Sequence, residues 1–188
     1  MGGVILLIIL GVVVLYGISA YNGLVSLKNQ TLNAFKQIDV QLKRRHDLVP
    51  NLVETVKGYA GHERGTLEAV VQARNQAVSA TGPAAKAEAE GELTRALRQV
   101  FALAESYPQL RAAESFAQLQ ASLGQIEDAI QNARRYYNAV VRDLNTRVAQ
   151  FPSNFVASAF GFAPREFFEL TSEGERQPPQ VRFGTGTP

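Results

Sequence analysis

The 188-residue sequence contains no cysteine and no tryptophan, and only one methionine and two histidines. The absence of cysteine excludes disulfide bonds, thiolate nucleophiles and thiolate metal ligands. An excess of charge of one sign is also missing, because 19 basic and 17 acidic residues give a formal net charge of +2. Such a balanced charge does not indicate a nucleic-acid partner. The remaining composition is rich in Ala, Gln, Leu, Val and Arg, which is typical of helices.

The most informative stretch is the uncharged run from Val4 to Tyr21. As a helix it would be about 27 Å long, close to the thickness of a bilayer hydrocarbon core. Tyr16 and Tyr21 lie towards one end of this run, where aromatic rings meet the membrane interface. We therefore predict a transmembrane anchor over residues 1–21, with contacts to the lipid bilayer from Val4, Leu10, Leu15, Tyr16 and Tyr21.

A cleaved signal peptide is the main alternative. Such peptides carry Lys or Arg before the apolar core, and none precedes Lys28 here, although residues 18–20 resemble a weak cleavage site. Lys28 and Lys36 follow the apolar run closely. The positive-inside rule therefore predicts a single-pass protein of the cell membrane with the bulk of the chain on the cytoplasmic side.

Beyond Tyr21 the apolar residues recur at helical spacing. A first stripe precedes Pro50, where a bend or break near residues 46–50 is expected, with Asp47 as a possible N-cap. The pattern leaves open whether one kinked helix or two helices surround Pro50. Residues 81–83 then end a helix, and a third begins at about Ala84. The first stripe comprises Leu24, Leu27, Ala34, Ile38 and Leu42.

The last helix, expected from about Gln109 to Gln150, has the most regular pattern. Its apolar residues alternate steps of three and four, the 3.5-residue period of coiled-coil packing. We therefore predict an all-α fold, an N-terminal transmembrane helix followed by an antiparallel up-and-down four-helix bundle with long helices over residues 22–151. The repeating positions are Phe116, Leu119, Leu123, Ile126, Ile130, Ala133, Tyr137, Val140 and Leu144.

Residues 152–170 form a Phe-rich segment, in which we expect short helical pieces at about 153–160 and 164–170. Either the rings close one end of the bundle, or they form an exposed patch for a partner or the membrane interface. Residues 171–188 are expected to be flexible or extended. The candidate contact residues here are Phe155, Phe160, Phe162, Phe167 and Phe168.

Four sequence blocks together resemble the LemA family. They are YNGLV at 21–25, IDVQLKRRHDLVPNLVETVKGYAGHE at 38–63, ARRYYNAVVRDLNT at 133–146 and FPSNFVASAFGF at 151–162. The resemblance extends over almost the whole chain. It implies a bacterial single-pass membrane protein with an antiparallel four-helix bundle and no agreed biochemical activity. Some members are associated with specialised bacterial membranes, which favours a membrane-organising role by analogy.

The sequence contains few candidates for a catalytic or metal-binding site. His46, Glu54 and His62 are eight residues apart, which is too far along one helix to ligate a metal together. His62 and Glu63 lack the second histidine of a zinc-protease helix. Nucleophile-elbow and phosphate-loop sequences are also missing. We therefore predict that the protein is not an enzyme and has no cofactor or metal.

Two groups of basic residues could have other roles. The run Lys43, Arg44, Arg45 and His46 is interpreted as a solvated face, or as a contact for lipid headgroups or an acidic partner. Asp143 and Arg147 are expected to form an ordinary i, i+4 surface pair. If Arg134 or Arg142 instead faces the bundle, it needs a buried carboxylate, for which Asp39 and Glu54 are candidates.

These observations favour a membrane-anchored helical scaffold or adaptor that self-associates into a homo-oligomer and organises membrane or partner proteins. The alternative is a regulatory subunit or adaptor of a membrane protease or transporter. The two hypotheses differ in whether a second copy of the chain or an unidentified membrane protein is the main partner.

Overall fold

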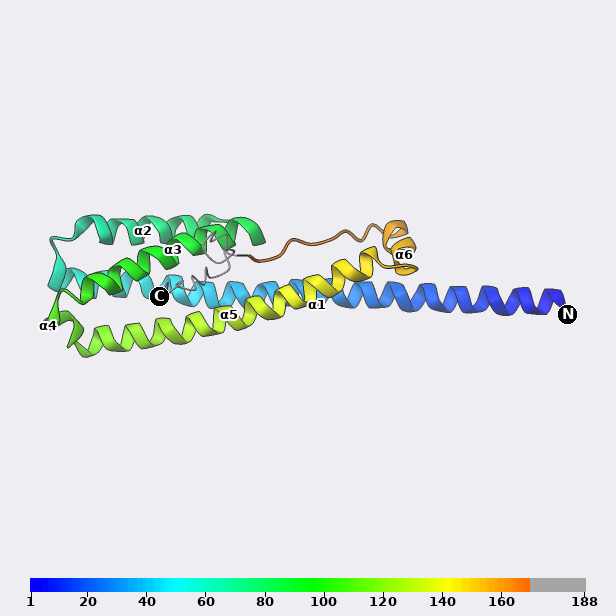
Figure 1. Cartoon of the computed structure of the whole chain (residues 1–188), viewed down its shortest axis with the longest axis horizontal. Helices are drawn as coiled ribbons and strands as arrows, with labels where there is room; N and C mark the ends of the chain where they lie inside the picture. The colour runs from blue at the N-terminus through cyan, green and yellow to red at the C-terminus, as the bar shows by residue number, and fades with distance from the viewer. Residues whose placement is uncertain (170–188) are drawn as a thin grey trace, which may run out of the picture.

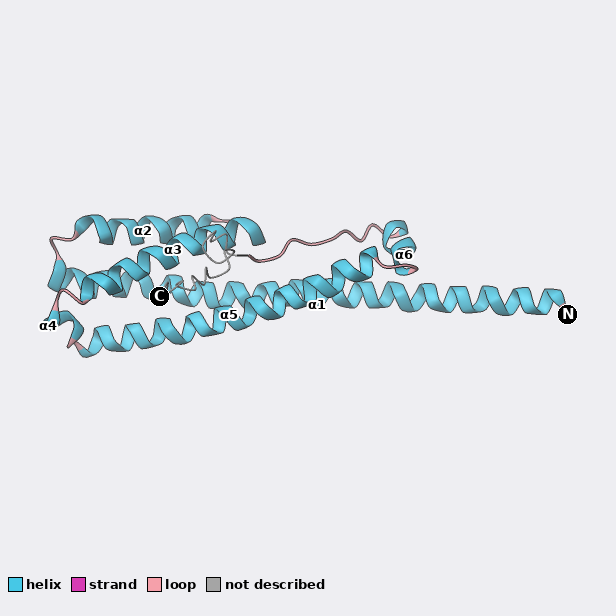
Figure 2. Ribbon diagram, in the orientation of Figure 1, coloured by secondary structure: helices cyan, strands magenta, loops and turns pink. Residues whose placement is uncertain are grey.

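The computed structural model describes residues 1–169, and this part of the chain is all-helical with no strand. The all-α prediction is therefore confirmed. Two long helices run side by side, and two shorter ones cover the end that lies farthest from the N-terminus (Figures 1 and 2). The helices are α1 (Gly2–Ala60), α2 (Arg64–Ser79), α3 (Pro83–Ala104), α4 (Pro108–Arg111), α5 (Glu114–Ala149) and α6 (Ser153–Ala159).

The N-terminal part of α1 projects beyond every other element (Figure 1). Its most apolar 18-residue window has a mean hydropathy of 2.7 and is only 6% buried. Among the described helices, α1 alone is long and apolar enough to cross a membrane. Because the apolar run is exposed, it is not part of the protein core. The same helix continues without a break into its C-terminal part, which does contribute to the core.

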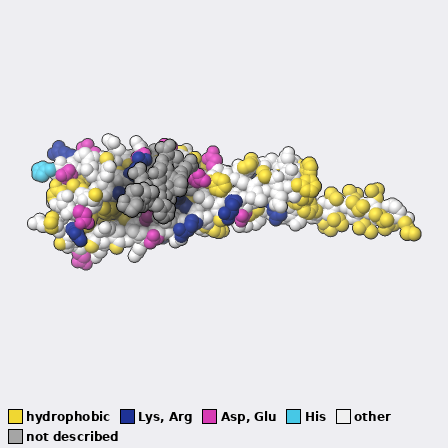
Figure 3. All heavy atoms as spheres, viewed as in Figure 1, with side chains coloured by type: hydrophobic (Ala, Val, Ile, Leu, Met, Phe, Trp, Pro, Cys, Tyr) yellow, Lys and Arg dark blue, Asp and Glu magenta, His cyan; other side chains and the backbone are white. Residues whose placement is uncertain are grey.

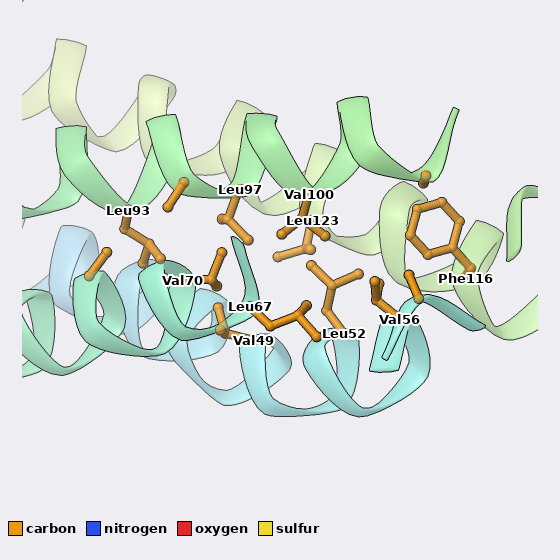
Figure 4. Packing of buried hydrophobic residues seen from close by; sticks show 14 of the residues in the cluster. Val49, Leu52, Val56, Leu67, Val70, Leu93, Leu97, Val100, Phe116 and Leu123 are labelled. Carbon is orange, nitrogen blue, oxygen red and sulfur yellow. The ribbon is translucent and has the colours of Figure 1, made fainter. Parts of the chain in front are cut away.

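The largest core lies where α1, α2, α3 and α5 meet (Figure 4). Leu52 of α1, Val70 of α2 and Leu93 of α3 are fully buried there, and Phe116 of α5 is 2% exposed. Two smaller clusters continue along the pair formed by α1 and α5, around Ile38 and then around Leu24. Apolar burial therefore continues along the rod, and the apolar stripes found in the sequence are the faces that make these clusters.

The helix α1 runs unbroken through Pro50, so the hypothesis of two separate helices at residues 46–50 is wrong. A proline in a helix leaves the carbonyl group four residues earlier without its usual donor, here that of His46. Arg74 of α2 supplies a replacement, since its Nε donates to the His46 carbonyl oxygen at 2.9 Å. The chain turns later, between Ala60 and Arg64, where Gly61 and His62 lie in the turn.

The expected last helix divides into α4 and α5, which are separated at residues 112–113. Its heptad pattern is confirmed as the buried face of α5: Phe116, Leu123, Ile130, Tyr137, Val140 and Leu144 are all buried. The positions between them, Leu119, Ile126 and Ala133, pack against the core while partly exposed. The periodicity located the α5 face correctly because burial of one helix face depends on local spacing.

The chain after α6 differs from the prediction. The helix expected at 164–170 is absent from residues 164–169, which have no regular secondary structure. Residue 170 and the tail expected to be flexible or extended at 171–188 lie outside the described part. The segment is held by side chains of α5. Asn138 accepts from the Phe168 amide at 2.9 Å and donates to its carbonyl at 3.2 Å, and Tyr137 donates to the Glu166 carbonyl at 2.8 Å. These bonds replace the hydrogen bonds that a helix would form within itself.

Candidate functional site

The candidate functional site is a buried ion cluster that joins α1, α3 and α5, made of Arg45, His46, Glu90 and Glu127. Arg45 and Glu90 are 3% and 2% exposed. Charged side chains with so little exposure are found in proteins when they are paired and hydrogen-bonded. Arg45, His46 and Glu90 are the buried acidic and basic residues of the described chain, and they lie together in this cluster.

Arg45 is the centre of the ion cluster. Its Nη1 donates to Glu127 Oε2 at 2.8 Å and to Thr94 Oγ1 at 3.0 Å. Its Nη2 donates to the Glu90 carboxylate and to the Glu90 carbonyl oxygen, the latter at 3.1 Å. Nε is the guanidinium nitrogen with no hydrogen-bond partner among residues 1–169. The planar fork of arginine suits this task, because it donates to several acceptors in a fixed geometry.

His46 completes the ion cluster from the next position on α1. Its Nε2 lies 2.6 Å from Glu90 Oε1. An ionised carboxylate only accepts hydrogen bonds, so Nε2 is the donor in this contact. Burial by itself raises the pKa of Glu90, but the hydrogen bond from His46 and the charge of Arg45 outweigh it and leave the pKa below its ordinary value. The Glu90 carboxylate is therefore held in its charged form.

The contacts of the ion cluster are ion pairs and hydrogen bonds that join α1, α3 and α5. The Glu90 carboxylate is enclosed by Arg45 and His46, whereas Glu127 pairs with Arg45 and has a side chain that is 33% exposed. A surface cavity of about 280 Å³ touches it and is lined partly by Arg45, Thr94 and Glu127. In the described part of the chain, no group of three or more His, Asp and Glu side chains is placed to hold a metal ion.

The interpretation of residues 43–46 as a solvated face is wrong for half of the run. Lys43 and Arg44 are exposed, and Lys43 pairs with Asp47 at 2.8 Å. Arg45 and His46 face the protein interior, so Arg45 is not available as a contact for lipid or a partner. The reason is the helical period: Arg45 lies between Leu42 and Val49 on the buried face of α1.

The other ion pairs in the structure also differ from those predicted from the sequence. Arg142 is exposed and lies 3.9 Å from Asp143, while Asp39 pairs with Lys86 at 2.5 Å. Glu54 pairs with Lys57 on the surface of α1 at 3.5 Å. Within residues 1–169 the buried arginine is Arg45, and its carboxylate partners are Glu90 and Glu127, not Asp39 or Glu54.

The Phe-rich segment is divided between core and surface. Phe168 is 1% exposed in the second cluster, and Phe162 is half-buried against Leu24 and Leu144. Phe168 is therefore excluded as a surface contact. The exposed rings are those of Phe151, Phe155, Phe160 and Phe167. The interpretation that the rings close the bundle therefore holds for Phe168, while a contact of the exposed rings with a partner or the membrane interface stays a prediction.

Sequence comparisons match the chain to the model of the LemA family over residues 34–183. Curated relatives include Magnetosome protein MamQ 2 of Paramagnetospirillum magneticum, which is 25% identical over 181 residues, 82% of this chain and 66% of the relative. Protein LemA of Metamycoplasma hominis is 28% identical over 159 residues, 82% of this chain and 71% of the relative. The chain thus spans about two thirds of the length of the first of these proteins. Neither name states a reaction.

Proposed function

Because this chain belongs to the LemA family, we propose that it is a membrane-anchored helical scaffold that self-associates and organises a membrane or the proteins within it. The observation that carries the proposal is the continuity of α1. One helix contains both an exposed apolar stretch long enough to span a bilayer and the side chains of the buried core.

In this proposal the body is an up-and-down four-helix bundle made of α1, α2, α3 and α5. The shared core of these helices supports that arrangement. The magnetosome proteins among the relatives support a role in membrane organisation by analogy. The two lysines after the apolar stretch, Lys28 and Lys36, support a cytoplasmic body. A reporter fused after Pro188 that is active only outside the cytoplasm would contradict this orientation.

Self-association is supported by an exposed apolar pair on α2. Val71 and Val78 are seven residues apart, so they lie on one face of the helix, and they are 39% and 55% exposed. Seven-residue spacing is the repeat by which two helices pack along a common seam. A second copy of α2 would cover both side chains.

Crosslinking in membranes tests this proposal directly. The chain has no native cysteine, so Val78→Cys introduces a unique thiol. We expect a thiol crosslinker to give a species of twice the chain mass from the Val78→Cys variant. The matched control is Gln118→Cys on the exposed face of α5, which should remain monomeric. A monomer from both variants, together with monomeric behaviour in detergent, would exclude self-association through this face.

A second function, an adaptor of a membrane protease or transporter, is favoured by a groove between α1 and α2. The groove has a volume of about 780 Å³ and combines apolar Val53, Leu67 and Val71 with charged Glu54 and Lys57. Such a mixture suits a peptide segment of another protein. The same experiment separates the two functions, because an adduct heavier or lighter than two chains would identify a heterologous partner.

A further inference from the structure

The end of the body nearest the exposed apolar stretch carries an aromatic band formed with α6. The Tyr21 ring lies 4.8 Å from the Phe160 ring and 5.8 Å from the Phe162 ring, centroid to centroid. Tyr21 is the last residue of the uncharged run, so α6 is fixed to the position where that run ends. Figure 3 shows the hydrophobic side chains gathered in a band at this level, next to the apolar projection.

Three phenylalanines of this band are turned outward. Phe151, Phe155 and Phe160 are 73%, 66% and 63% exposed, and the Phe151 and Phe155 rings lie 5.9 Å apart. Phe162, by contrast, packs against the third core cluster and holds the band in place. Phe160 contacts Tyr21 instead, so the exposed rings continue the aromatic band with apolar surface that water solvates poorly.

The charged residues closest to the band are basic. Lys28, Arg147 and Arg165 lie in or next to it, residues 1–38 and 144–165 contain no Asp or Glu, and the nearest acidic residues along the chain are Asp143 and Glu166 at the edges of the second range. Lys28 Nζ is 6.0 Å from the centroid of the Phe162 ring, and Lys28 and Arg165 line one cavity of about 240 Å³. Arg147 Nη2 lies beside Gly23, where a Cβ atom would be 3.7 Å away.

The order of these groups along α1 matches the layers of a bilayer. The apolar run ends at Tyr21, and Gly23 and Lys28 follow after two and seven residues. At 1.5 Å per residue these positions lie about 3 and 10 Å beyond the ring. The headgroup layer is about 5–7 Å deep on each side, so Gly23 falls within it and the long Lys28 side chain can reach back to it. With Tyr21 at the hydrocarbon boundary, the aromatic rings would meet the interface and the cations would face the lipid phosphates.

We propose that this end of the body is an interfacial belt, in which Phe151, Phe155 and Phe160 insert between lipid chains while Lys28, Arg147 and Arg165 bind the phosphates of anionic lipids. The belt rests on the proposed membrane anchorage, because Tyr21 places it at the bilayer surface. It has a consequence that an anchor alone would lack. A helix by itself can tilt and rotate, whereas a second contact beside it fixes the direction in which the body stands.

Single-tryptophan fluorescence in proteoliposomes tests the aromatic part of the belt. The chain contains no tryptophan, so Phe155→Trp in the full-length protein gives one emission signal. Lipids brominated near the headgroup quench a nearby indole. We expect a blue-shifted emission and several-fold stronger quenching for Phe155→Trp than for Tyr59→Trp, which is exposed at the opposite end of the body.

A third variant separates failure of the belt from failure of the anchor. Tyr16→Trp lies inside the apolar run and should be quenched by lipids brominated deep in the chains. Quenching of Tyr16→Trp with an unquenched Phe155→Trp would overturn the belt, show that another protein or water covers the rings, and leave the anchor in place. Quenching of neither would overturn both proposals. Quenching of Phe155→Trp alone would support insertion of the exposed rings into lipid, but it would reject the spanning helix and with it the depth that Tyr21 assigns to the belt.

The cationic part is tested by comparing two brominated lipids at equal mole fraction. We expect brominated phosphatidylglycerol to quench Phe155→Trp more strongly than brominated phosphatidylcholine. The triple variant Lys28→Gln, Arg147→Gln and Arg165→Gln should be quenched equally by the two lipids, so that the ratio of the two quenching values becomes one. The same number of charges removed at the distant exposed residues Arg64, Arg95 and Arg111 should leave it unchanged. A ratio of one in the parent, or an equal fall in both variants, would overturn the assignment of the cations.

Discussion

Asn145 forms both backbone hydrogen bonds of Arg165: its Oδ1 accepts from the Arg165 amide at 2.8 Å, and its Nδ2 donates to the Arg165 carbonyl at 2.9 Å. Asn138 does the same for Phe168, one heptad earlier on α5. Because seven residues return to the same face of a helix, the two side chains form a ladder that holds an antiparallel extended segment. Phe168 is thereby carried into the core between α1 and α5.

The double substitution Asn138→Ala and Asn145→Ala should release residues 163–169 from α5. Four hydrogen bonds are lost, each contributing about 1 kcal/mol. We expect faster native-state cleavage by trypsin after Arg165 and a lower free energy of unfolding. Asn132→Ala is the matched control, since its side chain contacts only the exposed Arg135. A cleavage rate equal to that of the control would contradict this role of the ladder.

Glu90→Gln should destabilise the protein strongly, because it removes a buried anion from between Arg45 and His46. Removing one partner of a buried pair costs about 3–5 kcal/mol, and the remaining Glu127 places the expected value at the lower end. Chemical denaturation measures the difference. Glu92→Gln, two residues further on α3, breaks only an exposed pair with Arg95 and should change stability by less than about 0.5 kcal/mol. Similar losses of unfolding free energy in both variants would show that the ion cluster contributes no more to stability than an exposed ion pair.

The lowered pKa of Glu90 also predicts a pH dependence. A carboxyl group whose folded pKa lies below its unfolded value contributes stability above the unfolded pKa, and this contribution is lost as the pH falls through the folded pKa. The groups that face Glu90 are Arg45 and His46 of α1, with Glu127 of α5 on the other side of Arg45. The free energy of unfolding should therefore fall on acidification below the ordinary glutamate range. It should fall less steeply in the Glu90→Gln variant, and parallel pH profiles would refute the link.

The contact between Arg74 and the His46 carbonyl predicts a coupling with Pro50. In the parent protein, Arg74→Ala leaves that carbonyl without either donor and should cost about 1–3 kcal/mol, as expected for a hydrogen bond from a charged group. In a Pro50→Ala background the restored amide at position 50 can donate to it, so the same substitution should cost less. A double-mutant cycle measures this difference as an interaction free energy. Additive effects would show that the two groups act independently.

Much of the fold was predictable because its signals are local. The uncharged run before Tyr21 and the heptad pattern of α5 depend only on the order of neighbouring residues. The ion cluster carried a weaker local signal that the sequence interpretation missed. Arg45 occupies a core position between Leu42 and Val49, and Glu90 lies on the buried face of α3 with Ala87 and Leu93. A charged residue on an apolar stripe indicates a buried pair, although it does not identify the partner.

The sequence by itself determined the helical character, the buried faces and the apolar projection, since each follows from spacing along one element. Only the tertiary structure decided which groups meet. Arg45 is 82 residues from Glu127 and Asn145 is 20 residues from Arg165, and no local period relates such positions. It also decided that α1 continues through Pro50, because the donor that satisfies the His46 carbonyl comes from another helix. Interactions between distant segments choose among conformations that local preferences leave close in free energy.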